Sequence, residues 1–308
     1  MSRPSCVTGA VQVLVPASSA NLGPGFDAMG LALSIHDELT AMITDDSGVR
    51  IDIQGEGAGE VPTDERHLVV QAMNLGFAAM DVEPAGFVLK CRNAIPHGRG
   101  LGSSASAIIG GLALARELVV GGGDLLPDSE LLNVALAMES HPDNLSASLY
   151  GGFTVSWLES ATQAGSVCID IHPNVIPIVA VPPHVLPTEQ ARGVLSENVA
   201  RADATHNVAR AGLLVHAMSV DPSYLLSATS DALHQQARSH IYPETTALIE
   251  TMRAEGIAAV ASGAGPAVLL LIDTSHPEHA HTVTRLVPPE WTSVAVPVDL
   301  EGVRRVAL

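Results

Sequence analysis

The chain has 308 residues, of which 47% are hydrophobic, so it is long enough for two domains or one large one with a substantial core. Its formal net charge of −18 makes nucleic acid an unfavourable partner and means that any phosphate-bearing ligand must be attracted by local dipoles, arginines or a cation. The three cysteines show neither disulfide nor metal-ligand spacing, and no apolar stretch is long enough to span a bilayer. These features predict a cytoplasmic protein with reduced thiols.

The first predicted strand, 11–16, ends at a proline and leads into a turn rich in glycine, proline and asparagine. Asn21 and Asp27 lie in this turn, and both side chains bind local backbone well, so turn chemistry alone is sufficient to explain them. The full stretch, Pro-Ala-Ser-Ser-Ala-Asn-Leu-Gly-Pro-Gly-Phe-Asp, is nevertheless longer than a turn requires.

Strands are predicted at 35–43 and 49–53, a helix with apolar helical spacing at 68–80, and a further strand at 86–91. The last of these delivers the most distinctive stretch of the chain, which has glycine at three alternate positions and then two serines. This stretch comprises Pro96, His97, Gly98, Arg99, Gly100, Leu101, Gly102, Ser103, Ser104, Ala105 and Ser106.

The residues after this loop, 105–118, are predicted to be helical, with Ser103 or Ser104 as the N-cap. A glycine loop at a helix N-terminus presents free N–H groups and the positive end of the helix dipole, which suit a phosphate. A tight turn that caps a buried helix explains the same composition equally well. The P-loop pattern is absent because no lysine follows, and the dinucleotide pattern fails because Ser103 stands where glycine is required.

A helix is also predicted from Pro127 to about Glu139, before a break at His141-Pro142-Asp143-Asn144. A lone carboxylate at the end of such a helix is usually solvated, so Glu139 has a simple surface interpretation. The polar stretch 157–166 marks the approach to a second domain, and we place the two domains at 1–160 and 161–308.

The second half is predicted to contain strands at 167–171 and 176–181, helices at 207–218 and 224–238, and two strands around the glycine turn 262–266. A loop from Leu186 enters a short helix that carries Arg192. Taken alone, Arg192 is an ordinary surface arginine, and the glycine turn is an ordinary hairpin.

Longer strings carry a family resemblance. Pro-x-Gly-x-Gly-Leu-Gly-Ser-Ser-Ala resembles the central motif of the kinase superfamily that includes galactokinase, homoserine kinase and mevalonate kinase. The stretch that ends at Asp27, the His-x-Asp-Asn segment and the segment from His234 to Arg238 resemble homoserine kinases in particular, although the last match is looser. The turn at 262–266 is similar to the third motif of the superfamily.

The resemblance implies an α+β, two-domain small-molecule kinase fold, with a ribosomal-protein-S5-like N-terminal domain and a ferredoxin-like C-terminal domain. It also implies transfer of the ATP γ-phosphoryl group to the side-chain hydroxyl of L-homoserine, on the route to threonine. The loop from Pro96 to Ser106 would bind the nucleotide, and Ser104 and Glu139 would hold Mg²⁺, which prefers oxygen ligands. The implied acceptor-binding residues are Asn21, Asp27, His141, Asn144, Thr188, Arg192, Arg238 and Gly263.

Three points stay open at this stage. Many relatives use an aspartate as a base, whereas homoserine kinases are thought to work without one, so Asp143 is only a candidate base beside Asn144. A kinase for another small alcohol and a catalytically silent sensor of nucleotide or amino acid are the alternative functions. Family members are often homodimers, and the sequence does not determine the oligomeric state.

Overall fold

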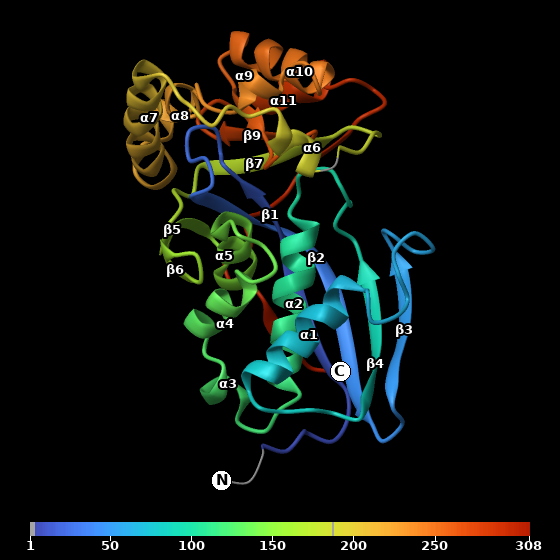
Figure 1. Ribbon diagram of the computed structural model, residues 1–308. Helices are drawn as coiled ribbons and strands as arrows, with labels where there is room; N and C mark the ends of the chain where they lie inside the picture. Colours follow the sequence, from blue (N-terminus) through green and yellow to red (C-terminus); the bar gives the residue numbers. More distant parts are fainter. Residues whose placement is uncertain (1–3, 187) are drawn as a thin grey trace.

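The chain folds into two β-sheets with helices packed against them, as seen in the computed structural model, which describes residues 4–186 and 188–308 (Figure 1). The larger sheet has the strand order β11-β1-β2-β4-β3, and β5 and β6 extend it beside β2. Neighbouring strands are antiparallel except β3 and β4, which run parallel. The strands are β1 (Val11–Ala20), β2 (Met29–Thr44), β3 (Gly48–Gly55), β4 (Gly86–Asn93), β5 (Phe153–Ser160), β6 (Gln163–Ile169) and β11 (Arg304–Val306).

Helices cover one face of this sheet, and α2 lies at their centre, in contact with α1, α5 and β1 (Figure 1). The burial of Val11, Val13 and Val15 at alternate positions of β1 gives that strand an apolar face toward the helices. The core between them includes Leu39 of β2 and Leu112 of α2. These helices are α1 (Leu68–Ala79), α2 (Ser103–Glu117), α3 (Gly122–Leu125), α4 (Asp128–Ala135) and α5 (Pro142–Tyr150).

The smaller, antiparallel sheet has the order β10-β7-β9-β8. Its strands are β7 (Val175–Val181), β8 (Ala258–Ala261), β9 (Val268–Asp273) and β10 (Thr292–Ala295). The remaining helices are α6 (Thr188–Gly193), α7 (Arg201–Ser219), a 3-10 turn (Pro222–Tyr224), α8 (Leu225–Ala228), α9 (Gln235–Arg238), α10 (Pro243–Ala254) and α11 (Glu278–Leu286). No helix in the described residues is long and apolar enough to cross a membrane.

One apolar cluster joins the two sheets. Leu22, Leu31 and Phe153 from the first sheet and its turn belong to the same buried cluster as Val179 and Leu269 of the second. Burying side chains of this size stabilises a protein by about 1.5–3 kcal/mol each, so the two sheets are held together by a shared core. The α+β fold class expected from the resemblance is confirmed by this mixture of helices and sheets.

Some of the predicted strand and helix bounds were wrong. Pro16 does not end β1; the pairing with β2 shifts register between Pro16 and Ala17, and the irregularity accommodates a residue that has no N–H to donate. The single helix predicted at 224–238 is divided into α8, a turn and α9. The boundary proposed at 160/161 falls between β5 and β6, which pair within the larger sheet, and the division into two domains stays a prediction.

Candidate active site

The loop of residues 94–102, which we call the glycine loop, connects β4 to α2. Its backbone is left-handed at Gly100, where φ is 77°, and at Gly102, where φ is 70°. A Cβ atom at Gly100 would overlap with the carbonyl oxygen of Ser262, and one at Gly102 would overlap with the hydroxyl of Ser18. Glycine is therefore required here both by the backbone conformation and by close packing against two other motifs.

Helix α2 begins at Ser103, with Gly102 in the N-cap position and no side-chain cap. The predicted serine cap was wrong, because the left-handed glycine itself turns the chain into the helix. The first bond of the helix runs from the Ser106 amide to the Gly102 carbonyl at 2.9 Å, so the amides before Ser106 have no acceptor within the helix. These free donors and the positive end of the dipole form an anion-binding site.

A cavity of about 90 Å³, the central cavity, lies at the N-terminus of α2, where α5 meets α6, α9 and the turn between β8 and β9. It brings together residues from every motif that the sequence analysis identified. The lining residues are Ala20, Asn21, Gly98, Gly100, Gly102, Ser103, Ser104, Ala105, Glu139, His141, Asp143, Asn144, Arg192, Arg238, Gly263 and Ala264.

Asn21 connects the stretch that ends at Asp27, which we call the first motif, with the third motif at 262–266. Its Nδ2 donates to the Gly263 carbonyl at 2.8 Å, and its Oδ1 accepts from the Asp27 amide at 3.0 Å. Asn21 and Asp27 both have positive φ, 69° and 54°, a conformation in which asparagine and aspartate are enriched. The turn chemistry expected of Asn21 is thus present, and the residue lines the central cavity as well.

Asp27 lies beside the cavity and forms an ion pair with Arg192, with Arg192 Nη2 2.9 Å from Asp27 Oδ1. His141 Nε2 is 3.9 Å from the other oxygen of the same carboxylate. The simple surface interpretation of Arg192 does not hold, because its guanidinium faces a carboxylate 165 positions away in the chain. Charges of both signs therefore stand together at one side of the cavity.

Glu139 and His141 form a second charged pair. Glu139 Oε1 accepts from the His141 amide at 3.2 Å and from His141 Nδ1 at 2.7 Å. Burial alone would raise the pKa of the Glu139 carboxyl, but the bonds from His141 hold that pKa below its ordinary value. The same hydrogen bond raises the pKa of His141, so this pair favours a carboxylate beside an imidazolium.

Asp143 and Asn144 lie in the first turn of α5. Asp143 is only 2% exposed and accepts a hydrogen bond from the Asn144 amide at 2.7 Å. Burial raises the pKa of Asp143 to about 6. Asn144 Oδ1 accepts from Ser18 Oγ at 2.8 Å, which leaves its Nδ2 group for the cavity.

Arg238 is 1% exposed, yet it reaches the central cavity. Its Nε donates to the carbonyl of Ala191 at 2.8 Å, and Ala191 directly precedes Arg192 in the chain. The two arginines therefore approach the cavity together, which is the arrangement needed to bind a carboxylate.

Some predicted site residues lie elsewhere. Leu101 and Ser106 are buried in the protein interior, and Arg99 donates to the carbonyls of Pro182 and Pro183 instead of facing the cavity. Pro96, like Arg99 and Leu101, lines a hollow outside the central cavity. The side chain of Thr188 lies outside the described residues.

A second cavity of about 300 Å³ adjoins the central one and was not predicted. The two cavities share Ser103 and Ser104. The walls of the second cavity also include Val61, Pro62 and Leu68. His67 and His97 also line it, and His97 belongs to the stretch expected to bind the nucleotide; in the described residues the buried Nδ1 of His67 has no partner. Apart from His97, Ser103 and Ser104, no motif marks the lining residues, since strands and loops far apart in the sequence bring them together.

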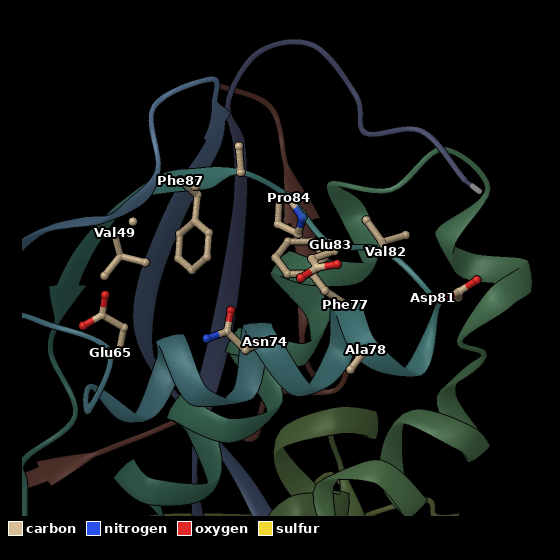
Figure 2. A pocket seen from close by; sticks show the side chains of 13 residues that line it. Val49, Glu65, Asn74, Phe77, Ala78, Asp81, Val82, Glu83, Pro84 and Phe87 are labelled. Carbon is tan, nitrogen blue, oxygen red and sulfur yellow. The ribbon is translucent and has the colours of Figure 1, made fainter. Parts of the chain in front are cut away.

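A larger hollow, of about 560 Å³, lies elsewhere (Figure 2). Phe77 of α1 and Phe87 of β4 point into it, and its rim carries Glu65, Asn74 and Asp81. None of the motif residues lines it. Volume alone therefore does not identify the site, whereas the convergence of the motifs on the central cavity does.

Comparisons with known proteins agree with this geometry. Residues 67–152 match the family model "GHMP kinases N terminal domain", and residues 217–283 match "GHMP kinases C terminal". The chain is 45% identical to the homoserine kinase of Streptomyces coelicolor over 98% of its own length and 96% of that protein. It is 43% identical to the homoserine kinase of Mycolicibacterium smegmatis, over 92% of this chain and 95% of that one.

The fold is shared with a solved structure. The crystal structure of homoserine kinase from Cytophaga hutchinsonii superposes with a TM-score of 0.83 at 24% identity, covering 96% of this chain and 97% of that one. At this identity the likeness establishes the fold, and the sequence relatives establish the family.

Proposed function

The chain belongs to the homoserine kinases of the GHMP kinase family, and on this premise we propose that it transfers the γ-phosphoryl group of ATP to the side-chain hydroxyl of L-homoserine. The product, O-phospho-L-homoserine, lies on the route to threonine. We also propose a cytoplasmic location. Cys6, Cys91 and Cys168 are all free thiols, which is typical of a reducing compartment.

The observation that carries the proposal is the pairing of opposite charges where Asp27, His141 and Arg192 meet at the central cavity. We call this part of the cavity the acceptor side. L-Homoserine has an ammonium and a carboxylate on one carbon. Asp27 offers a carboxylate to the ammonium, and Arg192 and Arg238 offer guanidinium groups to the carboxylate. Substrate would replace the Asp27–Arg192 ion pair by separate contacts with each partner.

The nucleotide would be bound by the backbone. The triphosphate fits the free amides at the start of α2, and the glycine loop lets the main chain approach it closely. The adjoining second cavity has room for a nucleoside next to Ser103 and Ser104. This arrangement explains how a chain with a net charge of −18 can bind an anion without a lysine in the loop.

The residues present fit a magnesium ion. Ser104 and Glu139 both line the central cavity and offer the hydroxyl and carboxylate oxygens that Mg²⁺ prefers. In the part of the chain that the structure describes, Glu139 Oε1 is bonded to His141 and its Oε2 accepts no hydrogen bond. Bound Mg²⁺ would neutralise phosphate charge as the phosphoryl group is transferred.

The acceptor hydroxyl would be oriented by Asn144, whose Oδ1 is fixed by Ser18. Phosphoryl transfer depends mainly on such positioning and on charge stabilisation. The hydroxyl proton passes either to Asp143, which lines the same cavity, or directly to a phosphate oxygen. Substitution of Asp143 separates these two routes.

The test is ADP release by the purified protein with MgATP, comparing L-homoserine with L-serine, mevalonate and no acceptor. We expect turnover with L-homoserine alone, because L-serine is one methylene shorter and mevalonate has no ammonium for Asp27. Turnover with mevalonate would overturn the assignment of the acceptor. ATP binding by calorimetry without ADP release for any acceptor would instead favour a nucleotide sensor.

A further inference from the structure

His234 has no part in the mechanism above, although it is completely buried beside the acceptor side of the central cavity. Its Nε2 lies 2.9 Å from the carbonyl oxygen of Gly23, and its Nδ1 lies 3.0 Å from Nη1 of Arg238. A carbonyl oxygen only accepts, so Nε2 must carry a proton; a guanidinium only donates, so Nδ1 must be unprotonated. The two contacts together require a neutral imidazole with its proton on Nε2.

The surroundings hold this ring in place. Phe26 stacks on it with ring centroids 5.2 Å apart and planes at 25°. The buried carboxylate of Asp231 accepts from the His234 amide at 3.0 Å and from the Gln235 amide at 2.8 Å, and its Oδ2 is 3.7 Å from Nε2. Burial lowers the pKa of His234, in agreement with a neutral ring.

Arg238 depends on His234 for its orientation. Its Nε is bonded to the Ala191 carbonyl and its Nη1 to His234, while the guanidinium carbon lies 5.9 Å from the centroid of Phe26. Among the residues that the structure describes, Nη2 donates to no acceptor. Two of the three nitrogens are thus fixed by protein groups, which leaves the third for a ligand in the cavity that Arg238 lines.

We propose that His234 is a positioning residue of the acceptor site, which acts as a neutral imidazole to link the first-motif turn at Gly23 to Arg238 and to aim Nη2 at the substrate carboxylate. This inference rests on the proposed function, since it assumes that Arg238 binds an amino-acid carboxylate. His234 itself touches no substrate, and its effect passes through Arg238.

The test uses His234→Leu in the full chain. We expect the KM for L-homoserine to rise about tenfold or more, with the KM for ATP within about twofold of wild type, because only the carboxylate contact is loosened. In an Arg238→Ala background, His234→Leu should add no further change in KM for L-homoserine. An unchanged KM in the single variant, or equal losses in both backgrounds, would overturn the proposal.

Thr229→Val is the matched control. Thr229 is buried, and its Oγ1 accepts from Arg253, another partly buried arginine of the same half of the chain, at 2.9 Å. This variant removes a comparable bond without touching the central cavity, so both KM values should stay within twofold of wild type. Aminopropanol, which keeps the hydroxyl and amine but lacks the carboxylate, provides a second check: His234→Leu should leave its kcat/KM unchanged.

Imidazole nitrogen NMR of the wild-type protein tests the inference without any variant. The expected spectrum shows His234 as a neutral Nε2–H tautomer; an imidazolium or the Nδ1–H tautomer at neutral pH would overturn the proposal. The proposed function fails separately, if wild-type protein does not phosphorylate L-homoserine. Normal wild-type turnover together with an unaffected His234→Leu variant would refute only the role of His234.

Discussion

The glycine loop and the segment of residues 221–242 both contribute to the central cavity, but they obtain their conformation differently. In the glycine loop, the residues themselves dictate the structure, because left-handed glycines and tight packing against Ser18 and Ser262 admit no side chain. In the 221–242 segment, a helical pattern is broken into short pieces that are held by the buried carboxylate of Asp231 and by Arg238. One region is specified locally and the other by its tertiary partners.

This difference predicts which substrate each region controls. Changes in the glycine loop should damage the use of ATP, whereas changes in the 221–242 segment and at Arg192 should damage the use of L-homoserine. Four substitutions follow in decreasing order of expected effect, and those at Gly100 and Arg192 test this division directly.

Gly100→Ala should have the largest effect. The new Cβ overlaps with the Ser262 carbonyl, which is backbone and cannot move aside, so the loop must shift away from its position at α2. We expect kcat/KM for ATP to fall by about 10²–10³-fold, the loss typical of a catalytic geometry displaced by about 1 Å. Gly121→Ala is the control, since Gly121 has a similar φ of 73° but open space around its Cβ. Equal activity losses in the two variants would contradict the steric argument.

Asp143→Asn comes next. If Asp143 takes the hydroxyl proton, kcat should fall by at least ~10²-fold. Because burial raises the pKa of Asp143 to about 6, the base is ionised above that pH, and wild-type kcat should decline as the pH falls below about 6. Asn at this position would abolish that decline. Asp128→Asn, at an exposed position of α4, is the control, and unchanged kcat in Asp143→Asn would assign the proton to a phosphate oxygen.

Arg192→Ala should act on the acceptor alone. Removing its guanidinium eliminates one carboxylate contact and leaves Asp27 without its partner. We expect the KM for L-homoserine to rise about 30-fold, while the KM for ATP changes less than about twofold. Arg201→Ala, at the exposed start of α7, should change neither value. A parallel rise in the KM for ATP would show that the two regions are not separate.

Asp231→Asn should have the smallest effect, and mainly on stability. Burial acts to raise the pKa of Asp231, but the interaction with His234 and the hydrogen bonds from Asn207 and the backbone amides hold that pKa below its ordinary value. Ionised Asp231 therefore stabilises the fold above the ordinary aspartate pKa, and this contribution is lost as the pH falls through the lower folded-state value.

Thermal unfolding at neutral pH should show a loss of about 1–2 kcal/mol for Asp231→Asn, which shrinks toward acid pH. Asp221→Asn is the control at an exposed site, where the asparagine oxygen can accept the same bonds from Ser223, so the free energy of unfolding should stay almost unchanged. An equal loss for both variants at every pH would contradict the role of the buried carboxylate.

The same contrast explains what could be predicted from the sequence. The strands at 35–43, 49–53 and 86–91 and the helix starting near residue 68 follow local apolar patterns, and they are present as β2, β3, β4 and α1. The convergence of Glu139, Asn144 and Arg192 on one cavity was implied only by family resemblance, and the structure brings them together.

Other features could not be predicted. The role of Ser18 depends on Asn144, 126 positions away, and that of His234 depends on Gly23, 211 positions away. The second cavity is lined by His67, Asn93 and His97, which share no motif. In each case, the partner is supplied by tertiary packing rather than by neighbours in the chain.

Phosphorus NMR of a reaction containing the protein, MgATP and L-homoserine tests the proposed activity most directly, because it identifies the bond that is formed. We expect a new phosphomonoester resonance that couples to the γ-methylene protons of homoserine and grows in step with ADP. Appearance of inorganic phosphate alone, or of no new resonance while ATP stays intact, would contradict phosphoryl transfer to the homoserine hydroxyl.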